Sequence, residues 1–263
     1  MKYSFMSFSC PELTLDEMLS MAKEFGYDGI EPRISSNHQH KIEFDTNQSQ
    51  REKIRRKAID AGIAIGCIAT SCRYADPETN QDMINDTKKA IDLTADIGSS
   101  RIRVFGGKIG EGLDRAAAVN LVAESLLSIS DYASKRGITI CVETHDDWCN
   151  PTDVAAVMEK VNHVAIAVNW DIMHPVRQGY ATIEESFEIL KPWIQHLHIH
   201  DGSIQKNLLP IGEGDIDHKS AIERLLTISF DGYLSGEWIG WDDPYRNYLP
   251  RELQTLKRYQ NEL

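Results

Sequence analysis

The chain has 263 residues, the usual size of a single α/β barrel, and its 41% of hydrophobic residues is typical of a globular protein. A net charge of −12 excludes a general nucleic-acid-binding surface, which needs excess Lys and Arg to neutralise phosphates. No apolar run approaches the ~20 residues of a membrane span, and residues 1–5 do not begin a signal peptide. We therefore expect a cytoplasmic protein that binds neither nucleic acid nor membranes. The five cysteines form no close C-x-x-C pair, so we expect them to be reduced.

Apolar strand-like runs alternate with amphipathic helix-like runs about eight times. The predicted strands are residues 3–8, 29–31, 63–70, 101–105, 138–144, 164–170, 194–200 and 233–238. The predicted helices are a first one that Thr14 caps and that ends at Phe25, and then residues 49–61, 80–97, 113–136, 152–161, 183–190, 218–228 and 250–263. Glu17, three residues after Thr14, completes a capping box.

This alternation, with nearly continuous apolar strands, predicts a parallel sheet closed into a (β/α)8 TIM barrel. We expect a single domain over residues 1–263, because no linker or charge block divides the chain. A doubly wound open sheet is the alternative. It would carry a glycine-rich fingerprint after the first strand, and Cys10-Pro11-Glu12 is not one.

Three histidines alternate along one predicted strand, at His196, His198 and His200. Strand geometry places alternate residues on one face, so the three imidazoles would point the same way. Buried neutral imidazoles are costly unless something uses their lone pairs, and a divalent metal is the obvious candidate. The alternative is one packed histidine and two solvated ones.

The neighbouring strands end in carboxylates. Glu143 ends the fifth predicted strand, Asp171 follows the sixth and Glu237 lies in the eighth, on either side of the histidine strand. In a TIM barrel the reacting groups lie at the C-terminal ends of the strands. Two carboxylates and a histidine suit a mid-row divalent ion, and a third carboxylate fits a five- or six-coordinate site.

Five motifs in this order resemble those of the sugar phosphate isomerase/epimerase family, the barrels related to xylose isomerase and endonuclease IV, over essentially the whole chain. They are V-E-T-H around Glu143, D-x-x-H-x-x-x-x-G from Asp171, H-x-H-x-x-D from His196, G-E-G-D-I-D from Gly212 and G-E-W around Glu237.

The resemblance implies that one divalent ion, Mn, Co, Zn or Mg, is bound by Glu143, Asp171, His198 and Glu237. It also implies that Glu143 and Glu237 are the acid/base pair of an isomerase or epimerase, one on each face of a small sugar or sugar-like polyol. Moving a proton beside a carbonyl or hydroxyl carbon needs a metal to hold the oxygens and a base whose pKa is near neutrality.

Four further residues are expected to bind substrate. Arg103, on the fourth predicted strand, could hold a carboxylate or phosphate with two parallel hydrogen bonds. His145 is either a substrate contact or part of a solvated loop, and His174 contacts the substrate or supports the metal site. Trp238 either walls the pocket or simply packs.

Three other assignments concern supporting residues. We expect Glu31 and Arg33, which end the second predicted strand, to pair with each other. His200 is expected to support the metal site or to pair with Asp201, and His196 to pack.

Other functions remain open at this stage. The sequence around E-T-H and R-x-R-x-F-x-G is also similar to metal-dependent 3-dehydroshikimate dehydratases, in which case Arg103 would hold the substrate carboxylate and His145 would take part in proton transfer. A DNA-repair endonuclease would need more metal ligands and a basic face. A metal-free sugar-binding barrel would be expected to lack one of the four ligands. A homo-oligomer is compatible with the sequence.

Overall fold

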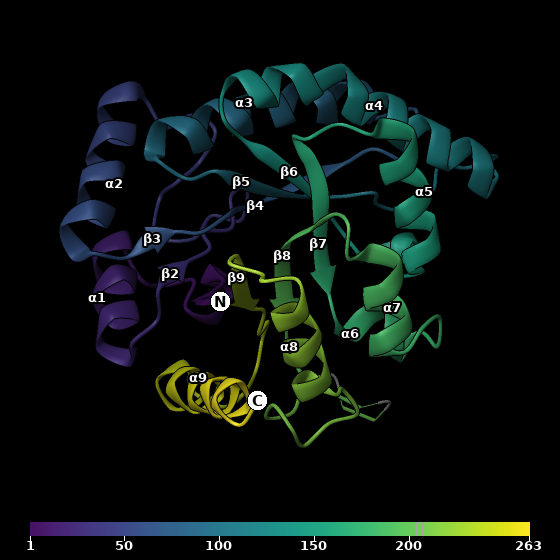
Figure 1. The fold of residues 1–263 in the computed structure, drawn as a ribbon. Coiled ribbons are helices and arrows are strands. Elements are labelled where there is room, and N and C mark those ends of the chain that lie inside the picture. The colour runs from purple at the N-terminus through teal and green to yellow at the C-terminus, as the bar shows by residue number, and fades with distance from the viewer. Residues whose placement is uncertain (204, 207) are drawn as a thin grey trace.

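Seven parallel strands form one curled sheet in the computed structural model, which describes residues 1–203, 205–206 and 208–263. The strand order is β1-β9-β8-β7-β6-β5-β4, and helices cover the outside of the sheet (Figure 1). The strands of this sheet are β1 (Lys2–Phe5), β4 (Ile68–Arg73), β5 (Arg101–Phe105), β6 (Thr139–Glu143), β7 (Ile166–Asp171), β8 (Ile194–Ile199) and β9 (Tyr233–Gly236).

The remaining gap, between β1 and β4, is filled by the segment around Glu31. The short strands β2 (Gly29–Ile30) and β3 (Ala64–Ile65) pair in parallel there. Single parallel bridges then join Met6 to Glu31 and Arg33 to Ala69. Each bridge is held by backbone hydrogen bonds, such as the one of 2.9 Å from the Glu31 N–H to the Phe5 carbonyl. The sheet is therefore closed, and the predicted TIM barrel is confirmed.

Local signals in the sequence define most of the helix ends. The helices are α1 (Leu15–Phe25), α2 (Gln48–Ala61), α3 (Asn80–Ile97), α4 (Arg115–Lys135), α5 (Pro151–Val161), α6 (Met173–Arg177), α7 (Ile183–Leu190), α8 (His218–Thr227) and α9 (Tyr245–Asn261), with short 3-10 turns at Ser7–Ser9 and Asp146–Trp148. Thr14 and Glu17 form the predicted capping box of α1. Gly98 ends α3 in the left-handed conformation, which costs glycine no steric strain.

Several predicted elements differ from the structure. The first predicted strand, residues 3–8, ends at Phe5 and is followed by the 3-10 turn Ser7–Ser9, and α6 was not predicted. The third predicted strand, residues 63–70, is divided into β3 and β4, and it breaks at Gly66, where a Cβ would lie 3.0 Å from the ring of Tyr233. The last helix begins at Tyr245, not Pro250, and the proline lies inside it. Tyr248 and Leu249, which precede the proline, are buried, so their packing outweighs the hydrogen bond that proline cannot donate.

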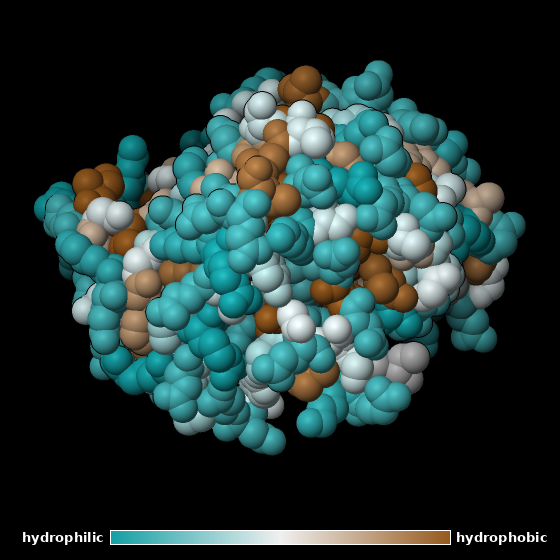
Figure 2. All heavy atoms as spheres, turned by 60° about the horizontal axis from the view of Figure 1, so that its bottom comes forward, coloured by the Kyte–Doolittle hydropathy of each residue, from teal (hydrophilic) through white to brown (hydrophobic). Residues whose placement is uncertain are grey.

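The strands present apolar residues outward to the helices and a polar layer to the barrel interior. In β6, Ile140 and Val142 pack in the hydrophobic core, while Glu143, of opposite parity to Val142, is buried at the C-terminal end of the strand. The outer surface is different: on the face in Figure 2, hydrophilic residues predominate and hydrophobic ones form separate small groups. None of the described helices is both long enough and apolar enough to cross a membrane.

Candidate active site and metal centre

Four buried side chains from adjacent strands meet at the C-terminal mouth of the barrel. Glu143 and Asp171 are the last residues of β6 and β7, His198 lies in β8, and Glu237 follows β9. Each side chain offers one potential ligand atom, and these four atoms lie within 4.8 Å of one another. The structure thus brings together all four residues of the predicted metal set, from segments far apart in the sequence.

His198 is at the centre of this cluster. Its Nδ1 atom lies 2.7 Å from Oε1 of Glu143 and 3.2 Å from Oε2 of Glu237. Burial by itself would raise the pKa of Glu237, but the nearby imidazole of His198 outweighs it and lowers this pKa to about 2. Glu237 is therefore ionised at neutral pH.

Asp171 is held in place by backbone and side-chain hydrogen bonds. One carboxylate oxygen, Oδ1, accepts the backbone N–H groups of Met173 (2.9 Å) and His174 (3.2 Å). The other, Oδ2, lies 2.8 Å from Nε2 of His200. Burial acts to raise the pKa of Asp171, but the imidazoles of His200, His174 and His198 hold this pKa below its ordinary value. His200 therefore pairs with Asp171, whereas the expected alternative partner was Asp201.

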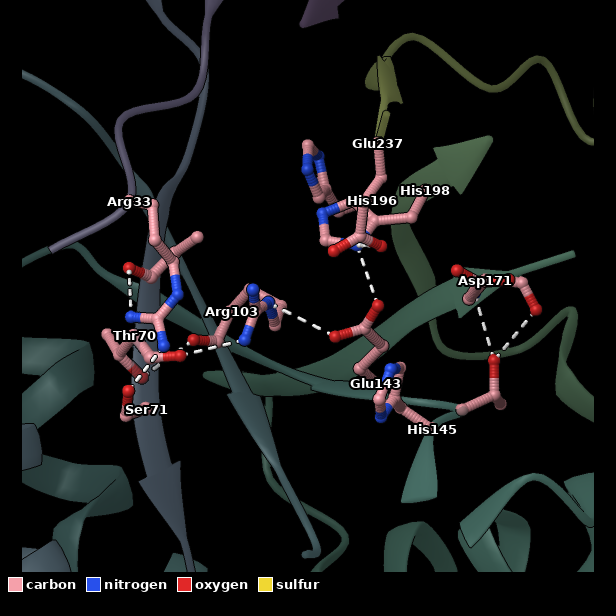
Figure 3. Close-up of polar contacts among 12 residues, drawn as sticks. Arg33, Thr70, Ser71, Arg103, Glu143, His145, Asp171, His196, His198 and Glu237 are labelled. Atoms are coloured by element: carbon pink, nitrogen blue, oxygen red, sulfur yellow. Dashed lines mark hydrogen bonds and ion pairs between the residues drawn. The ribbon is translucent and has the colours of Figure 1, made fainter. Parts of the chain in front are cut away.

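Arg103 and His198 contact different oxygens of the Glu143 carboxylate (Figure 3). The Nε atom of Arg103 is 3.1 Å from Oε2 of Glu143, and its Nη1 donates a hydrogen bond of 2.7 Å to the carbonyl of Thr70. The guanidinium also stacks 4.0 Å from the ring centroid of Phe105. Arg103 thus balances the buried charge of Glu143 and fixes the direction of its carboxylate.

An open pocket of about 210 Å³ lies over the cluster, and Glu237 is part of its wall. His145 and His174 both line it, with ring centroids 4.3 Å apart. Nδ1 of His145 lies 2.9 Å from Oδ1 of Asp146. Burial would lower the pKa of His145, but this contact and the nearby carboxylates raise it to about 9. Two of the four predicted substrate-binding residues therefore face the pocket.

Trp238 has a different position. Its side chain is buried and stacks at 5.4 Å on Tyr248 of α9, and it is not among the residues that line this pocket. The indole thus takes the packing position that the sequence left open as the alternative.

Glu31 and Arg33 are the residues whose environment the sequence did not predict. Their expected mutual pair is wrong: Glu31 lies 2.8 Å from Nε2 of His196 and 3.0 Å from Nε2 of His198. Arg33 instead donates to the hydroxyl of Ser71 and to backbone carbonyls. The rule that reactive groups follow barrel strands applies to Glu31, but β2 has only two residues and gives a weak signal.

The donor set fits a divalent ion. Three carboxylates and one imidazole nitrogen are ligands for Mn, Co, Zn or Mg. Oε2 of Glu143 and Oε2 of Glu237 are buried, yet neither accepts a well-oriented hydrogen bond from the described residues. Arg103 and His198 lie 3.1 Å and 3.2 Å from these two oxygens as ion pairs, and a bound cation would use the acceptor capacity that remains.

The model of the family described as "Xylose isomerase-like TIM barrel" matches residues 19–259 of this chain. The chain belongs to this family. A curated relative is a 3-dehydroshikimate dehydratase of Bacillus anthracis, 22% identical over 97% of this chain and 96% of the relative. The crystal structure of a D-psicose 3-epimerase in the presence of D-fructose matches with a TM-score of 0.82 at 16% identity, covering 99% of each chain. A xylose isomerase-like barrel of Mycobacterium smegmatis in complex with magnesium matches with a TM-score of 0.73 at 20% identity, covering 98% of this chain and 97% of that one.

Family membership identifies this xylose isomerase-like barrel as an enzyme of the sugar isomerase and epimerase kind.

The motif G-E-G-D-I-D is explained by Asp201, the last residue of H-x-H-x-x-D. The Asp201 carboxylate accepts backbone N–H groups from Gly202, Gly212, Gly214 and Ile216. A Cβ at Gly214 would lie 2.1 Å from the Asp201 carboxylate, so a larger residue there would displace the loop. The two motifs therefore form one structural unit beside the site.

Proposed function

We propose that this protein is a metal-dependent isomerase or epimerase of a small sugar or sugar-like polyol, in which Glu143 and Glu237 transfer the proton. The observation that carries the proposal is the buried cluster of Glu143, Asp171, His198 and Glu237 beneath an open pocket. Glu143, Asp171, His198 and Glu237 would hold one divalent ion, which supplies positive charge beside the substrate oxygens.

The chain's own residues would divide the proton-transfer work between two carboxylates. Glu143 and Glu237 come from β6 and the end of β9, and β7 and β8 lie between these strands in the sheet. One carboxylate would remove the proton from one face of the substrate carbon, and the other would return it on the opposite face. Arg103 would hold the carboxylate of Glu143 in its direction, and His145 and His174 would bind substrate hydroxyls in the pocket.

The first experiment is to purify the protein without chelator and measure its metal content, with one ion per chain expected. Ketoses of four to six carbons are then incubated in D2O, and NMR follows the exchange of carbon-bound hydrogen. We expect exchange in at least one sugar, and a loss of about 100-fold or more in Glu143→Gln and in Glu237→Gln. The exposed and distant Asp131→Asn is the matched control and should exchange like the wild type. A protein without a bound ion, or exchange that persists in both glutamine variants, contradicts the proposal.

A lyase is the second candidate, and two observations favour it. The dehydratase relative covers almost the whole chain. In addition, His145, which the resemblance to 3-dehydroshikimate dehydratases implies in proton transfer, lines the same pocket as Glu237. Arg103, the implied contact of the substrate carboxylate, is instead buried against Glu143. The test is incubation with 3-dehydroshikimate. A rise in the ultraviolet absorbance of protocatechuate would replace the first candidate by the second, and no rise would remove the lyase.

A further inference from the structure

Glu31 is a completely buried carboxylate that the proposed chemistry does not use. It follows β2, and its two oxygens contact two histidines of β8. Oε2 lies 2.8 Å from Nε2 of His196, and Oε1 lies 3.0 Å from Nε2 of His198. Glu31 therefore connects the segment after β2 to His198, one of the four clustered residues. It contacts the ring nitrogen of His198 that does not face Glu143 and Glu237.

The direction of these hydrogen bonds follows from the chemistry of the groups. Each oxygen of Glu31 lies within hydrogen-bond distance of one imidazole Nε2 atom, and an ionised carboxylate can only accept hydrogen bonds. The Nε2 atoms of His196 and His198 must then donate. Without an ion, Nδ1 of His198 carries a proton that faces Glu143. An ion bound there would replace that proton, and the neutral ring, with its remaining proton on Nε2, would offer the lone pair of Nδ1. In His198, Nδ1 is the atom that faces Glu143 and Glu237.

We propose that Glu31 is a positioning residue that fixes His198 with its Nδ1 atom as the metal-binding nitrogen. This inference rests on the proposed function. A carboxylate that holds the far nitrogen of a metal-binding histidine sets the orientation and basicity of the ring. His196 contributes by occupying the second oxygen of Glu31, so the carboxylate cannot turn away from His198.

A second ion among Glu31, His196 and His198 is the competing explanation, since their ligand atoms also lie within 4.8 Å of one another. That ion would bind Nε2 of His198 while the first ion binds Nδ1. His198 would then need a free lone pair on both ring nitrogens. A neutral imidazole has a free lone pair on only one of them, because the other nitrogen carries the proton. The hydrogen-bonded arrangement needs a free lone pair on Nδ1 alone. The metal content of the wild type separates the two, because one ion per chain supports positioning and two ions overturn it.

The variant Glu31→Gln tests the role directly. A glutamine has one oxygen and one amide donor, so it cannot accept from both imidazoles. We expect the affinity for Mn²⁺, measured by competition with a chelator, to fall about 10–100-fold. Glu31→Asp keeps both acceptor oxygens and should recover part of that loss. The matched control is Ser4→Ala, because Ser4 is also buried in the barrel, in β1, and its hydroxyl has no hydrogen-bond partner among the described residues.

The ring state of His198 gives a measurement that requires no variant. In wild-type protein labelled with ¹⁵N-histidine and loaded with Zn²⁺, we expect a protonated Nε2 and a metal-bound Nδ1 at His198. A metal-bound Nε2, or a Glu31→Gln affinity within threefold of the wild type, overturns the inference while leaving the proposed function intact. A wild type that binds no divalent ion overturns both.

Discussion

At the residue scale, Asp201 shows how a buried carboxylate can organise a loop without taking part in the chemistry. Its two oxygens accept four backbone N–H groups at 2.8–3.3 Å, and the side chain is completely buried. Backbone groups of a loop that are buried away from water need such an acceptor. The same carboxylate contacts none of the four clustered ligands, so stability and metal binding can be separated here.

We predict that Asp201→Asn lowers the free energy of unfolding by about 2–3 kcal/mol, because an amide NH2 would face N–H donors that lose their acceptor. Urea denaturation measures this, and the Mn²⁺ affinity should stay within threefold of the wild type. The control is Asp217→Asn in the same motif. Asp217 caps α8 by accepting from Ser220 N–H, and asparagine caps a helix equally well. Equal stability of the two variants would contradict the assignment.

At the scale of the elements, a charged cluster ties α2, α3 and α4 together. Asp96 of α3 lies 3.0 Å from Nη1 of Arg51 in α2 and 2.6 Å from Nη2 of Arg136, which ends α4. Arg136 also contacts Asp92 at 3.1 Å. A network of this kind is worth more than an isolated surface pair, although solvent screens each contact.

Asp96→Asn should lower stability by about 1 kcal/mol at pH 7. Partial burial would raise the pKa of Asp96, but its hydrogen bonds from the two arginines lower this pKa below its ordinary value. The stabilisation is therefore present above the unfolded pKa of about 3.9, and it disappears as the pH falls through the lower folded pKa. Urea denaturation from pH 7 to pH 2 gives the free energy of unfolding of the wild type and of Asp96→Asn. The two values should converge only in acid. The control Asp131→Asn, 87% exposed, should match the wild type throughout. A gap that does not depend on pH would mean that charge is not the cause.

The sequence predicted elements best where the signal is local. The helix Ile183–Leu190 and the strand Arg101–Phe105 have their predicted bounds, since a capping box or an apolar run with glycine behind it is visible within a few residues. Long-range packing is not visible in this way. The start of α9 at Tyr245 depends on burial of Tyr248 beside Trp238, and the partners of Glu31 lie 165 and 167 residues away.

For the site, the strand-end rule and the motif resemblance were enough to select the four clustered residues. Their meeting point follows from topology alone: consecutive parallel strands place their C-terminal ends at one rim. The contacts that each side chain makes at this rim depend on the direction in which it projects, and the sequence does not show this direction. Trp238 and Glu237 are adjacent in sequence, yet one packs against α9 and the other lines the pocket.

At the scale of the whole molecule, the barrel concentrates negative charge at one buried point. Glu143, Asp171 and Glu237 converge there, and mutual repulsion among buried carboxylates opposes folding unless cations compensate. Arg103 and His198 compensate part of it. A ligand that binds only the folded barrel stabilises it by mass action, and at 100 times its dissociation constant the gain is about 2.7 kcal/mol.

We therefore predict that Mn²⁺ at this saturation raises the melting temperature of chelator-treated protein by about 5–10 °C, since 1 kcal/mol shifts a chain of this size by roughly 2–4 °C. The shift, followed by circular dichroism, should grow with the logarithm of the free ion concentration. Asp171→Asn should lose most of this shift in melting temperature, because the neutral amide binds a cation more weakly. Asp96→Asn should keep the whole shift, although its melting temperature without the ion is lower, because its network lies between α2, α3 and α4. Equal shifts in both variants would place ion binding elsewhere than at the barrel mouth, and no shift with Mn²⁺, Co²⁺, Zn²⁺ or Mg²⁺ would contradict metal binding altogether.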